Sequence, residues 1–285
     1  MGLLEGKVAL VTGAARGQGR AHAVTCAREG ADVIVVDVAR QLSTVLYPMA
    51  TSDDLAETAR QVEALGRKVI SAEADVRDQA ELDGCVVRGI DELGGIDILI
   101  ANAGIWGFGP LWELSDEQWE EMIGVNLTGV WRSIKAVTPH MIERCSGSIV
   151  ITASANSYEP GENYTHYTTA KYGLVGLTAN TAVELAQYGI RCNAIGPGAV
   201  DTPMLQNQIA YDMFAGHEGG TEAELIQGGR YYHKLRGVAL LDPQDIADTA
   251  LYLNSHLASK VTGVTIPVEA GHLLIRGVND NPIVT

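Results

Sequence analysis

Residues 12–19 read TGAARGQG, and the segments on either side of them decide the fold. An apolar, β-branched run, Lys7–Thr12, precedes them, and a segment of helical composition, Gly17–Glu29, follows. This order predicts a buried strand, a glycine-rich turn and a helix. Glycines also serve ordinary turns, so it is the position directly after the first strand that indicates a binding turn.

The same alternation continues along the chain. Apolar runs that predict buried strands recur at Asp32–Asp37, Val69–Ala74, Ile96–Ala101, Ser148–Thr152 and Ile190–Ile195. Helical segments separate them, at Asp53–Leu65, Gln79–Leu93, Asp116–Arg144 and His166–Tyr188. Such a pattern predicts an α/β fold in which helices cover both faces of a doubly wound parallel sheet, a Rossmann fold. Because the sequence has no internal repeat or low-complexity linker, we expect residues 1–285 to form a single domain.

Two connections are longer than the few residues that are usual in α/β units. Residues 38–52 form an inserted loop between the second strand and the next helix, and residues 203–236 form an irregular segment beyond a strand end. Long connections in compact domains often cover ligands. We therefore expect the inserted loop to lie over a binding site and the second segment to act as a substrate lid.

The composition excludes several kinds of partner. Twenty basic and 35 acidic residues give a net charge of −15, which disfavours binding to nucleic acid or to an anionic membrane surface. No apolar run is long enough to cross a bilayer, and residues 1–10 lack the features of a signal peptide, so we expect a cytoplasmic protein. The cysteines and histidines show no metal-ligand spacing, so no metal site is predicted.

Each glycine of the turn has a separate predicted role. Gly13 permits the tight turn, Gly17 lets the backbone approach a pyrophosphate, and Gly19 lets the helix pack closely on the sheet. The N-terminus of the helix adds unpaired N–H groups and the positive end of its dipole for the phosphates. The turn therefore predicts a dinucleotide site.

Polar residues at other strand ends extend this site. Asp37 ends the second strand, where a carboxylate can bind the adenosine ribose and repel a 2′-phosphate, which favours NAD over NADP. An ordinary strand-end carboxylate is the alternative, and Arg16 could instead pair with a 2′-phosphate. Residues 75–76 and 102–104 follow the third and fourth strands, at the edge where open α/β sheets bind ligands.

Tyr167 and Lys171 lie four residues apart and so share one face of the predicted helix. Reduction of a ketone needs an acid that protonates the developing alkoxide, and the reverse oxidation needs a base. Free tyrosine titrates near 10, but a nearby ammonium stabilises the phenolate and lowers that pKa. An exposed pair with a weak surface contact is the alternative.

Two further residues favour a catalytic role for this pair. Ser154 follows the strand Ser148–Thr152, so its hydroxyl can donate a hydrogen bond to a substrate oxygen at the same sheet edge. The amide of Asn126, in the middle of a predicted helix, could hold a water or a backbone group in a proton path. A strand-end cap and a satisfied core amide are the respective alternatives.

Six ordered motifs carry a resemblance to a known family: Thr12-Gly13-x-x-x-Gly17-x-Gly19, Asn102-Ala103-Gly104, Asn126, Ser154, Tyr167-x-x-x-Lys171 and Pro197-Gly198-x-Val200-x-Thr202. Over nearly its whole length the chain resembles the short-chain dehydrogenase/reductase family. The resemblance implies a homotetrameric, NAD-dependent enzyme that interconverts a secondary alcohol and its ketone. It implies Tyr167 as the general acid/base and Lys171 as its pKa-lowering, ribose-binding partner. It further implies that Ser154 donates to the substrate oxygen and that Asn126 holds a relay water.

The cofactor site that follows from these motifs spans several loops, with residues 196–202 at the nicotinamide end. Its expected members are Gly13, Arg16, Gly17, Gln18, Gly19, Asp37, Asp75, Val76, Asn102, Ala103, Gly104, Tyr167, Lys171, Pro197, Gly198, Val200 and Thr202.

A narrower likeness comes from residues 13–20 (GAARGQGR), the inserted loop with Tyr47-Pro48-Met49-Ala50, and residues 74–77 (ADVR). These resemble the carveol-dehydrogenase-like branch that is associated with mycofactocin, a peptide-derived redox carrier. The resemblance implies that the inserted loop covers the NAD, so that the nicotinamide is re-oxidised in place. A surface elaboration or a subunit contact is the alternative for the loop.

Apolar residues in the segments expected to roof the pocket favour a small hydrophobic alcohol or ketone, cyclic or terpenoid, as the substrate. They are Tyr158, Pro160, Met204, Tyr211, Met213 and Phe214. A non-catalytic, dinucleotide-binding sensor or regulatory protein is the alternative function, because the fold alone does not imply catalysis.

Overall fold

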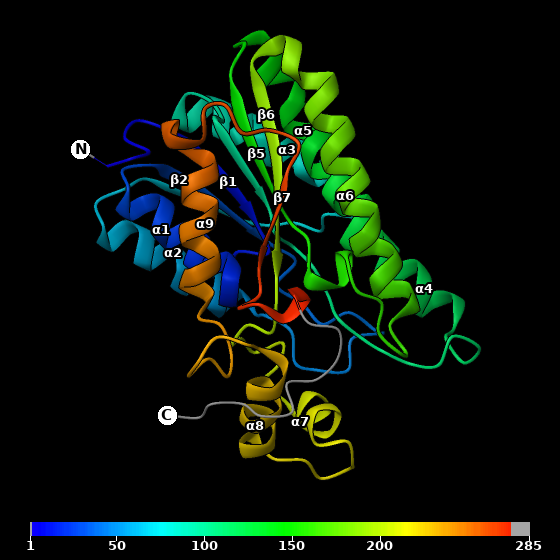
Figure 1. Ribbon diagram of the computed structural model, residues 1–285. Helices are drawn as coiled ribbons and strands as arrows, with labels where there is room; N and C mark the ends of the chain where they lie inside the picture. The colour runs from blue at the N-terminus through cyan, green and yellow to red at the C-terminus, as the bar shows by residue number, and fades with distance from the viewer. Residues whose placement is uncertain (1, 275–285) are drawn as a thin grey trace.

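The computed structural model describes residues 2–274, which are built around one parallel sheet (Figure 1). Its strands run in the order β3-β2-β1-β4-β5-β6-β7. Their bounds are β1 Val8–Thr12, β2 Asp32–Asp37, β3 Val69–Glu73, β4 Ile98–Ala101, β5 Gly147–Thr152, β6 Ile190–Pro197 and β7 Thr265–Val268. The predicted doubly wound parallel sheet is confirmed. Its order reverses between β1 and β4, where such sheets leave a crevice for ligands.

Two layers of helices cover the sheet, as Figure 1 shows. One face carries α1 Gly17–Arg28, α2 Ser52–Ala64 and α9 Pro243–Asn254, and the other carries α3 Gln79–Leu93, α5 Gly129–Glu143 and α6 Thr165–Leu185. Because helices pack on both sides, β1 is buried at every position and β2 at its four central positions. No helix within residues 2–274 is long and apolar enough to cross a membrane.

The prediction of one continuous α-helix over Asp116–Arg144 is wrong in one respect, because a π-helical turn interrupts it. The structure has α4 Asp116–Ile123, a π-helical turn Gly124–Thr128 and then α5. The backbone stays helical throughout, so the residue pattern gives no stop signal. The wider turn holds Asn126, and π turns occur frequently at functional sites.

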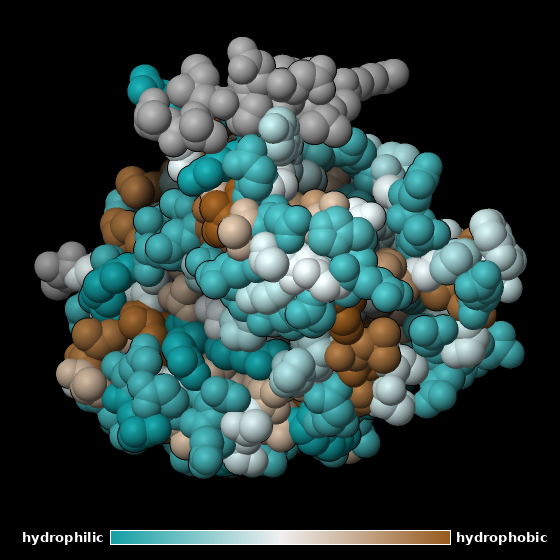
Figure 2. Space-filling model, turned by 90° about the horizontal axis from the view of Figure 1, so that it is seen from below, coloured by the Kyte–Doolittle hydropathy of each residue, from teal (hydrophilic) through white to brown (hydrophobic). Residues whose placement is uncertain are grey.

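The segment 203–236 is also more regular than predicted. It contains α7 Gln208–Ala215 and α8 Glu222–Tyr232, which pack together at the carboxyl end of the sheet (Figure 1). Asn207 caps α7, and Thr221 with Glu224 forms a capping box on α8. Such caps can be recognised in a sequence. Seen from this end, the surface is mainly hydrophilic, and hydrophobic residues appear in separate patches (Figure 2).

Two further elements, α9 and β7, were not predicted from the sequence. α9 begins at Pro243 after an Asp242 cap, a standard start signal. β7 has four residues, includes Pro267 and is only half-buried, because it forms the edge of the sheet beside β6. A strand this short, without alternation or a run of buried residues, has no periodic signal.

His22, in α1, predicts how the stability of the fold depends on pH. Its side chain is 1% exposed, and neither ring nitrogen has a hydrogen-bond partner within the described residues. Burial lowers its pKa from 6.5 to about 4. The folded state therefore holds His22 neutral, while the unfolded chain protonates it below about pH 6.5. This stabilising contribution is complete above that pH and is lost as the pH falls towards 4.

We expect His22→Leu to remove this acid sensitivity. Between about pH 7.5 and pH 5 the wild-type free energy of unfolding should fall by about 2 kcal/mol more than that of the variant. Denaturant unfolding of both proteins at the two pH values measures the difference. Equal pH dependence of the two proteins would show that His22 is not responsible.

Candidate active site

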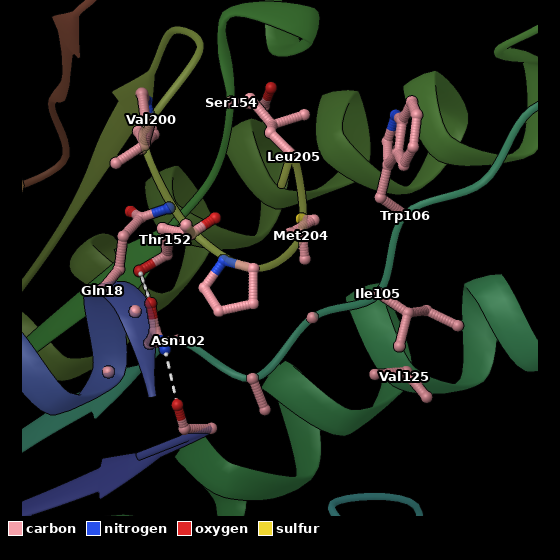
Figure 3. Close-up of a pocket in the computed structure, with 18 of the residues that line it drawn as sticks. Gln18, Asn102, Ile105, Trp106, Val125, Thr152, Ser154, Val200, Met204 and Leu205 are labelled. Atoms are coloured by element: carbon pink, nitrogen blue, oxygen red, sulfur yellow. Dashed lines mark hydrogen bonds between the residues drawn. The ribbon is translucent and has the colours of Figure 1, made fainter. Parts of the chain in front are cut away.

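A cavity of about 270 Å³ opens at the carboxyl ends of the strands. All the residues expected to bind the cofactor line it, and so does Ser154. Figure 3 shows Gln18 and Asn102 on one side of the cavity and Ile105 and Trp106 on the other. The structure thus brings together, from distant parts of the chain, all the predicted site residues except Asn126. Asn126 is not part of the cavity wall.

The glycine turn presents bare backbone to this cavity. A Cβ on Gly13 would lie 2.7 Å from the Cα of Ala103, and one on Gly19 would lie 1.8 Å from the carbonyl oxygen of Gly13. Gly13 and Gly17 adopt positive φ angles of 66° and 54°, which favour glycine. Arg16, at the N-cap of α1, makes no side-chain cap within the described chain, so N–H groups of the first turn stay open to a ligand.

Asn102 connects the turn to the next strands. Its amide nitrogen donates to the carbonyl oxygens of Thr12 and Gly13, at 3.1 and 3.3 Å. The Thr152 hydroxyl donates to its amide oxygen at 3.2 Å, and Figure 3 shows Asn102 held between these groups. Conversely, the Thr12 hydroxyl accepts from the N–H groups of Asn102 and Ala103, both at 3.1 Å. The loops after β1, β4 and β5 are therefore fixed relative to one another.

Asp37 and Arg16 lie where the adenosine end of a dinucleotide is expected. The Asp37 carboxylate accepts from the N–H groups of Ala15 and Ala39 at 3.1 and 3.0 Å. Burial raises its pKa, and these hydrogen bonds and Arg16 offset only part of the rise. The Arg16 guanidinium donates to the carbonyl of Pro48, in the inserted loop. Arg16 thus already has a partner, which weakens the alternative that it selects a 2′-phosphate.

Tyr167 and Ser154 meet at the other end of the cavity. Ser154 hydrogen-bonds the phenol of Tyr167 and also accepts from the N–H of Asn156 at 3.1 Å. Burial raises the pKa of Tyr167, and the hydrogen bond with Ser154 lowers it by less. The Tyr167 side chain is half-buried and lines the cavity. The phenol is therefore protonated near neutral pH in this arrangement.

Lys171 is buried beside them, with 5% of its surface exposed. Its ammonium donates to the carbonyl of Thr152 at 2.9 Å and lies over the ring of Tyr167, 5.7 Å from the centroid. Burial lowers the pKa of Lys171 to about 8. Burial is the larger influence on the pKa of Tyr167, and the hydrogen bond with Ser154 acts against it. The pKa-lowering role of Lys171 stays a prediction.

Asn126 acts on backbone from behind the cavity wall. Its amide oxygen accepts from the N–H of Ile105, and its amide nitrogen donates to the carbonyl of Ile105, each at 2.8 Å. Ile105 lines the cavity directly after the loop 102–104. Of the two groups that the sequence left open, a water or a backbone group, the structure shows Asn126 holding backbone.

The inserted loop 38–52 packs into the site. Leu42, Val45 and Tyr47 are buried in one apolar cluster with Ile105 and Trp106. The Tyr47 hydroxyl accepts from the N–H of Trp106 at 3.2 Å. Five residues of the loop line the cavity, namely Val38, Leu42, Tyr47, Met49 and Ala50. The loop thus forms part of the cavity wall.

The apolar lining agrees only in part with the predicted roof. Met204, Met213 and Phe214 line the cavity, whereas Tyr158, Pro160 and Tyr211 do not. Asn156, Tyr164 and Tyr232 are among the lining residues that sequence reasoning missed. Asn156 and Tyr164 lie close in sequence to Ser154 and Tyr167, which is a usable signal. Tyr232 reaches the site only through the packing of α8.

A glycine turn that exposes backbone beside a buried phenol and ammonium defines a class, the dinucleotide-dependent oxidoreductases. Comparison with known sequences identifies the family within this class. The chain belongs to the short-chain dehydrogenase/reductase family, because the family model described as short chain dehydrogenase matches residues 7–212.

Individual relatives place the chain within this family. It is 43% identical over 277 residues to the (−)-trans-carveol dehydrogenase of Rhodococcus erythropolis, covering 96% of this chain and 100% of the relative. It is 45% identical over 279 residues to an uncharacterised NAD-dependent oxidoreductase of Mycobacterium tuberculosis, covering 95% and 98%. The crystal structure of carveol dehydrogenase from Mycobacterium avium in complex with NAD superposes with a TM-score of 0.94 at 41% identity, covering 96% and 100%. The chain is a member of the carveol-dehydrogenase-like branch.

Proposed function

We propose that this protein interconverts a hydrophobic secondary alcohol, cyclic or terpenoid, and its ketone, with NAD as the cofactor. It is an oxidoreductase of the short-chain family, and its relatives include NAD-dependent enzymes. The observation that carries the proposal is that Ser154 and Tyr167 line the same cavity as the glycine turn. A substrate held by these hydroxyls would therefore share the cavity with a dinucleotide bound by the turn.

The cavity fits a dinucleotide on structural grounds. The clash that any Cβ on Gly13 or Gly19 would cause keeps backbone, and no side chain, against the space for a pyrophosphate. The amide oxygen of Gln18 is buried at the cavity without a hydrogen-bond partner among residues 2–274. Asp37 offers its carboxylate at the end of β2. We assign the adenosine ribose to Asp37 and the nicotinamide end to residues 197–202.

The chain's own residues then move the proton. NAD, when bound, supplies the nicotinamide carbon that exchanges a hydride with the substrate carbon. Ser154 hydrogen-bonds the substrate oxygen, and Tyr167 gives it a proton in ketone reduction or removes one in alcohol oxidation. Because burial raises the pKa of Tyr167, the phenol holds its proton near neutral pH, and the rate of alcohol oxidation should rise with pH as phenolate forms. The ammonium of Lys171 favours the phenolate, and its charge is lost progressively above about pH 8.

The lining supports a hydrophobic substrate. Trp106, Met204, Met213 and Phe214 contribute apolar surface to the cavity, and the rings of Trp106, Phe108 and Tyr164 cluster beside Tyr167. A sugar phosphate would leave its hydroxyls and charge without partners against such surface. A relative named for its action on carveol, a cyclic terpenoid alcohol, gives further support.

We further propose that the NAD is held in place and re-oxidised there by mycofactocin. The support is the inserted loop, which lines the cavity on the side of the glycine turn and receives a hydrogen bond from Arg16. The enzyme is proposed to be a cytoplasmic homotetramer, as the family resemblance implies.

Tyr167→Phe tests the acid/base assignment. Removal of the hydroxyl should lower turnover about 10²- to 10⁴-fold, because the substrate oxygen loses its proton donor. Tyr172→Phe, on the same helix but exposed, should leave turnover unchanged. Steady-state assays across pH measure both, and NAD content checks that the site is intact. Turnover by Tyr167→Phe at the wild-type rate with an unchanged pH profile would rule out the assigned role.

Retention of the cofactor is tested with protein as purified. We expect about one NAD per chain to survive gel filtration. Carveol should reduce it once, and turnover should continue only when an artificial electron acceptor such as dichlorophenolindophenol is added. Equally fast turnover with free NAD and no acceptor would show that the cofactor exchanges, and would contradict re-oxidation in place.

A further inference from the structure

The inserted loop is fastened by polar groups as well as by its apolar cluster. The N–H and the hydroxyl of Thr44 both donate to one carboxylate oxygen of Glu121 in α4, at 3.1 and 2.5 Å. Leu42 and Val45 lie on either side of Thr44 in the loop, and their side chains are buried. The contact with Glu121 therefore holds the loop at the point where it enters the cavity wall.

Glu121 also belongs to a chain of charges that reaches the predicted adenine side of the cavity. Its other carboxylate oxygen accepts from Arg77 at 2.8 Å. Arg77 in turn donates to both carboxylate oxygens of Asp75, at distances of 2.7 to 3.1 Å. Arg40, from the inserted loop, donates to the same Asp75 at 3.0 Å. The loop is thus tied at residues 40 and 44 to one continuous network (Asp75–Arg77–Glu121).

Burial distinguishes this network from surface ion pairs. The side chains of Asp75 and Glu121 are 9% and 8% exposed, whereas Arg40 is 58% exposed. Burial opposes ionisation of Asp75, yet the hydrogen bonds from Arg77 outweigh it and hold the pKa of Asp75 below its usual value. Removing one member of a buried ionic network leaves the others without partners, which costs far more than the loss of an exposed pair.

From this arrangement we infer that Glu121 is a positioning residue that sets how slowly NAD leaves. It lines no part of the cavity and has no contact with the reacting groups. Its effect passes through Thr44 to the inserted loop, and through Arg77 to the cavity-lining Asp75. The inference rests on the proposed function, because it requires NAD to occupy the cavity beneath the loop.

The same helix provides a matched control. Glu117, one turn before Glu121, accepts from the hydroxyl of Ser43 at 2.7 Å, so it also binds the inserted loop. This contact is exposed, and water can replace it. If any carboxylate on α4 held the loop, Glu117 and Glu121 would matter equally; if the buried network holds it, only Glu121 matters.

The test compares Glu121→Gln with Glu117→Gln, each purified with its bound NAD. The amide oxygen of a glutamine cannot serve both Thr44 and Arg77, and its NH₂ group would face a donor. Release of bound NAD is followed by chase with isotopically labelled NAD. Amide hydrogen exchange of residues 40–47 reports on the loop itself. We expect Glu121→Gln to release NAD roughly ten times faster or more, with less protection of the loop, and Glu117→Gln to match the wild type.

A second pair of variants keeps the test decisive if Glu121→Gln folds poorly. Thr44→Val removes only the hydroxyl from the loop side and leaves Glu121, Arg77 and Asp75 intact, and Ser43→Ala is its control. We expect faster release of NAD from Thr44→Val at an unchanged melting temperature, a combination that a purely structural role would not produce.

Release at the wild-type rate from both Glu121→Gln and Thr44→Val would overturn the inference, as would equal acceleration by Glu117→Gln. A wild-type protein that loses its NAD during gel filtration would instead contradict the retained cofactor, and the inference with it. NAD retention by the wild-type protein therefore separates a failure of the role of Glu121 from a failure of the retained cofactor.

Discussion

The close approach of the turn after β1 to the loop after β4 is the constraint on which the site depends. Gly13 has no room for a side chain against Ala103, and the Thr12 hydroxyl accepts from the N–H groups of Asn102 and Ala103. From Asn102 the hydrogen bonds continue to Thr152, whose carbonyl accepts from Lys171. One chain of contacts therefore links the glycine turn to the ammonium beside the phenol of Tyr167.

Burial sets the acid–base properties of this site more than pairwise charges do. It raises the pKa of Tyr167 and lowers that of Lys171, so each group is shifted towards its neutral form. The family resemblance had implied that Lys171 lowers the pKa of the phenol. Burial acts in the opposite direction on the phenol and is the larger of the influences on its pKa, so the contribution of Lys171 stays a prediction.

The sequence predicted what is encoded locally. Strand β2 and helix α3 have the expected bounds, because a run of buried residues and a clear cap mark them. The glycine turn and the pair Tyr167 and Lys171 were found because their spacing reflects their chemistry. Helices α7 and α8 were missed, although Asn207 and Thr221 signal their starts. These two caps could have been recognised in the sequence.

Other features depend on contacts between distant residues, and no local pattern encodes them. Thr44 and Glu121 lie 77 positions apart in sequence, and their pairing exists only because the inserted loop folds onto α4. The π turn at Asn126 leaves a continuous helical pattern, so the wider turn cannot be read from periodicity. Tyr232 reaches the cavity through the packing of α8. The site's outline was therefore predictable, while the closure of its adenosine side was not.

The proposed reaction passes a hydride from a secondary alcohol to a nicotinamide held in this cavity. The most direct test incubates the protein, as purified, with carveol and other cyclic secondary alcohols deuterated at the carbinol carbon. The cofactor is then released by denaturation and weighed by mass spectrometry. We expect reduced NAD that carries one deuterium from at least one of these alcohols, in an amount equal to the amount of protein. Cofactor that stays oxidised or unlabelled with every alcohol would contradict it.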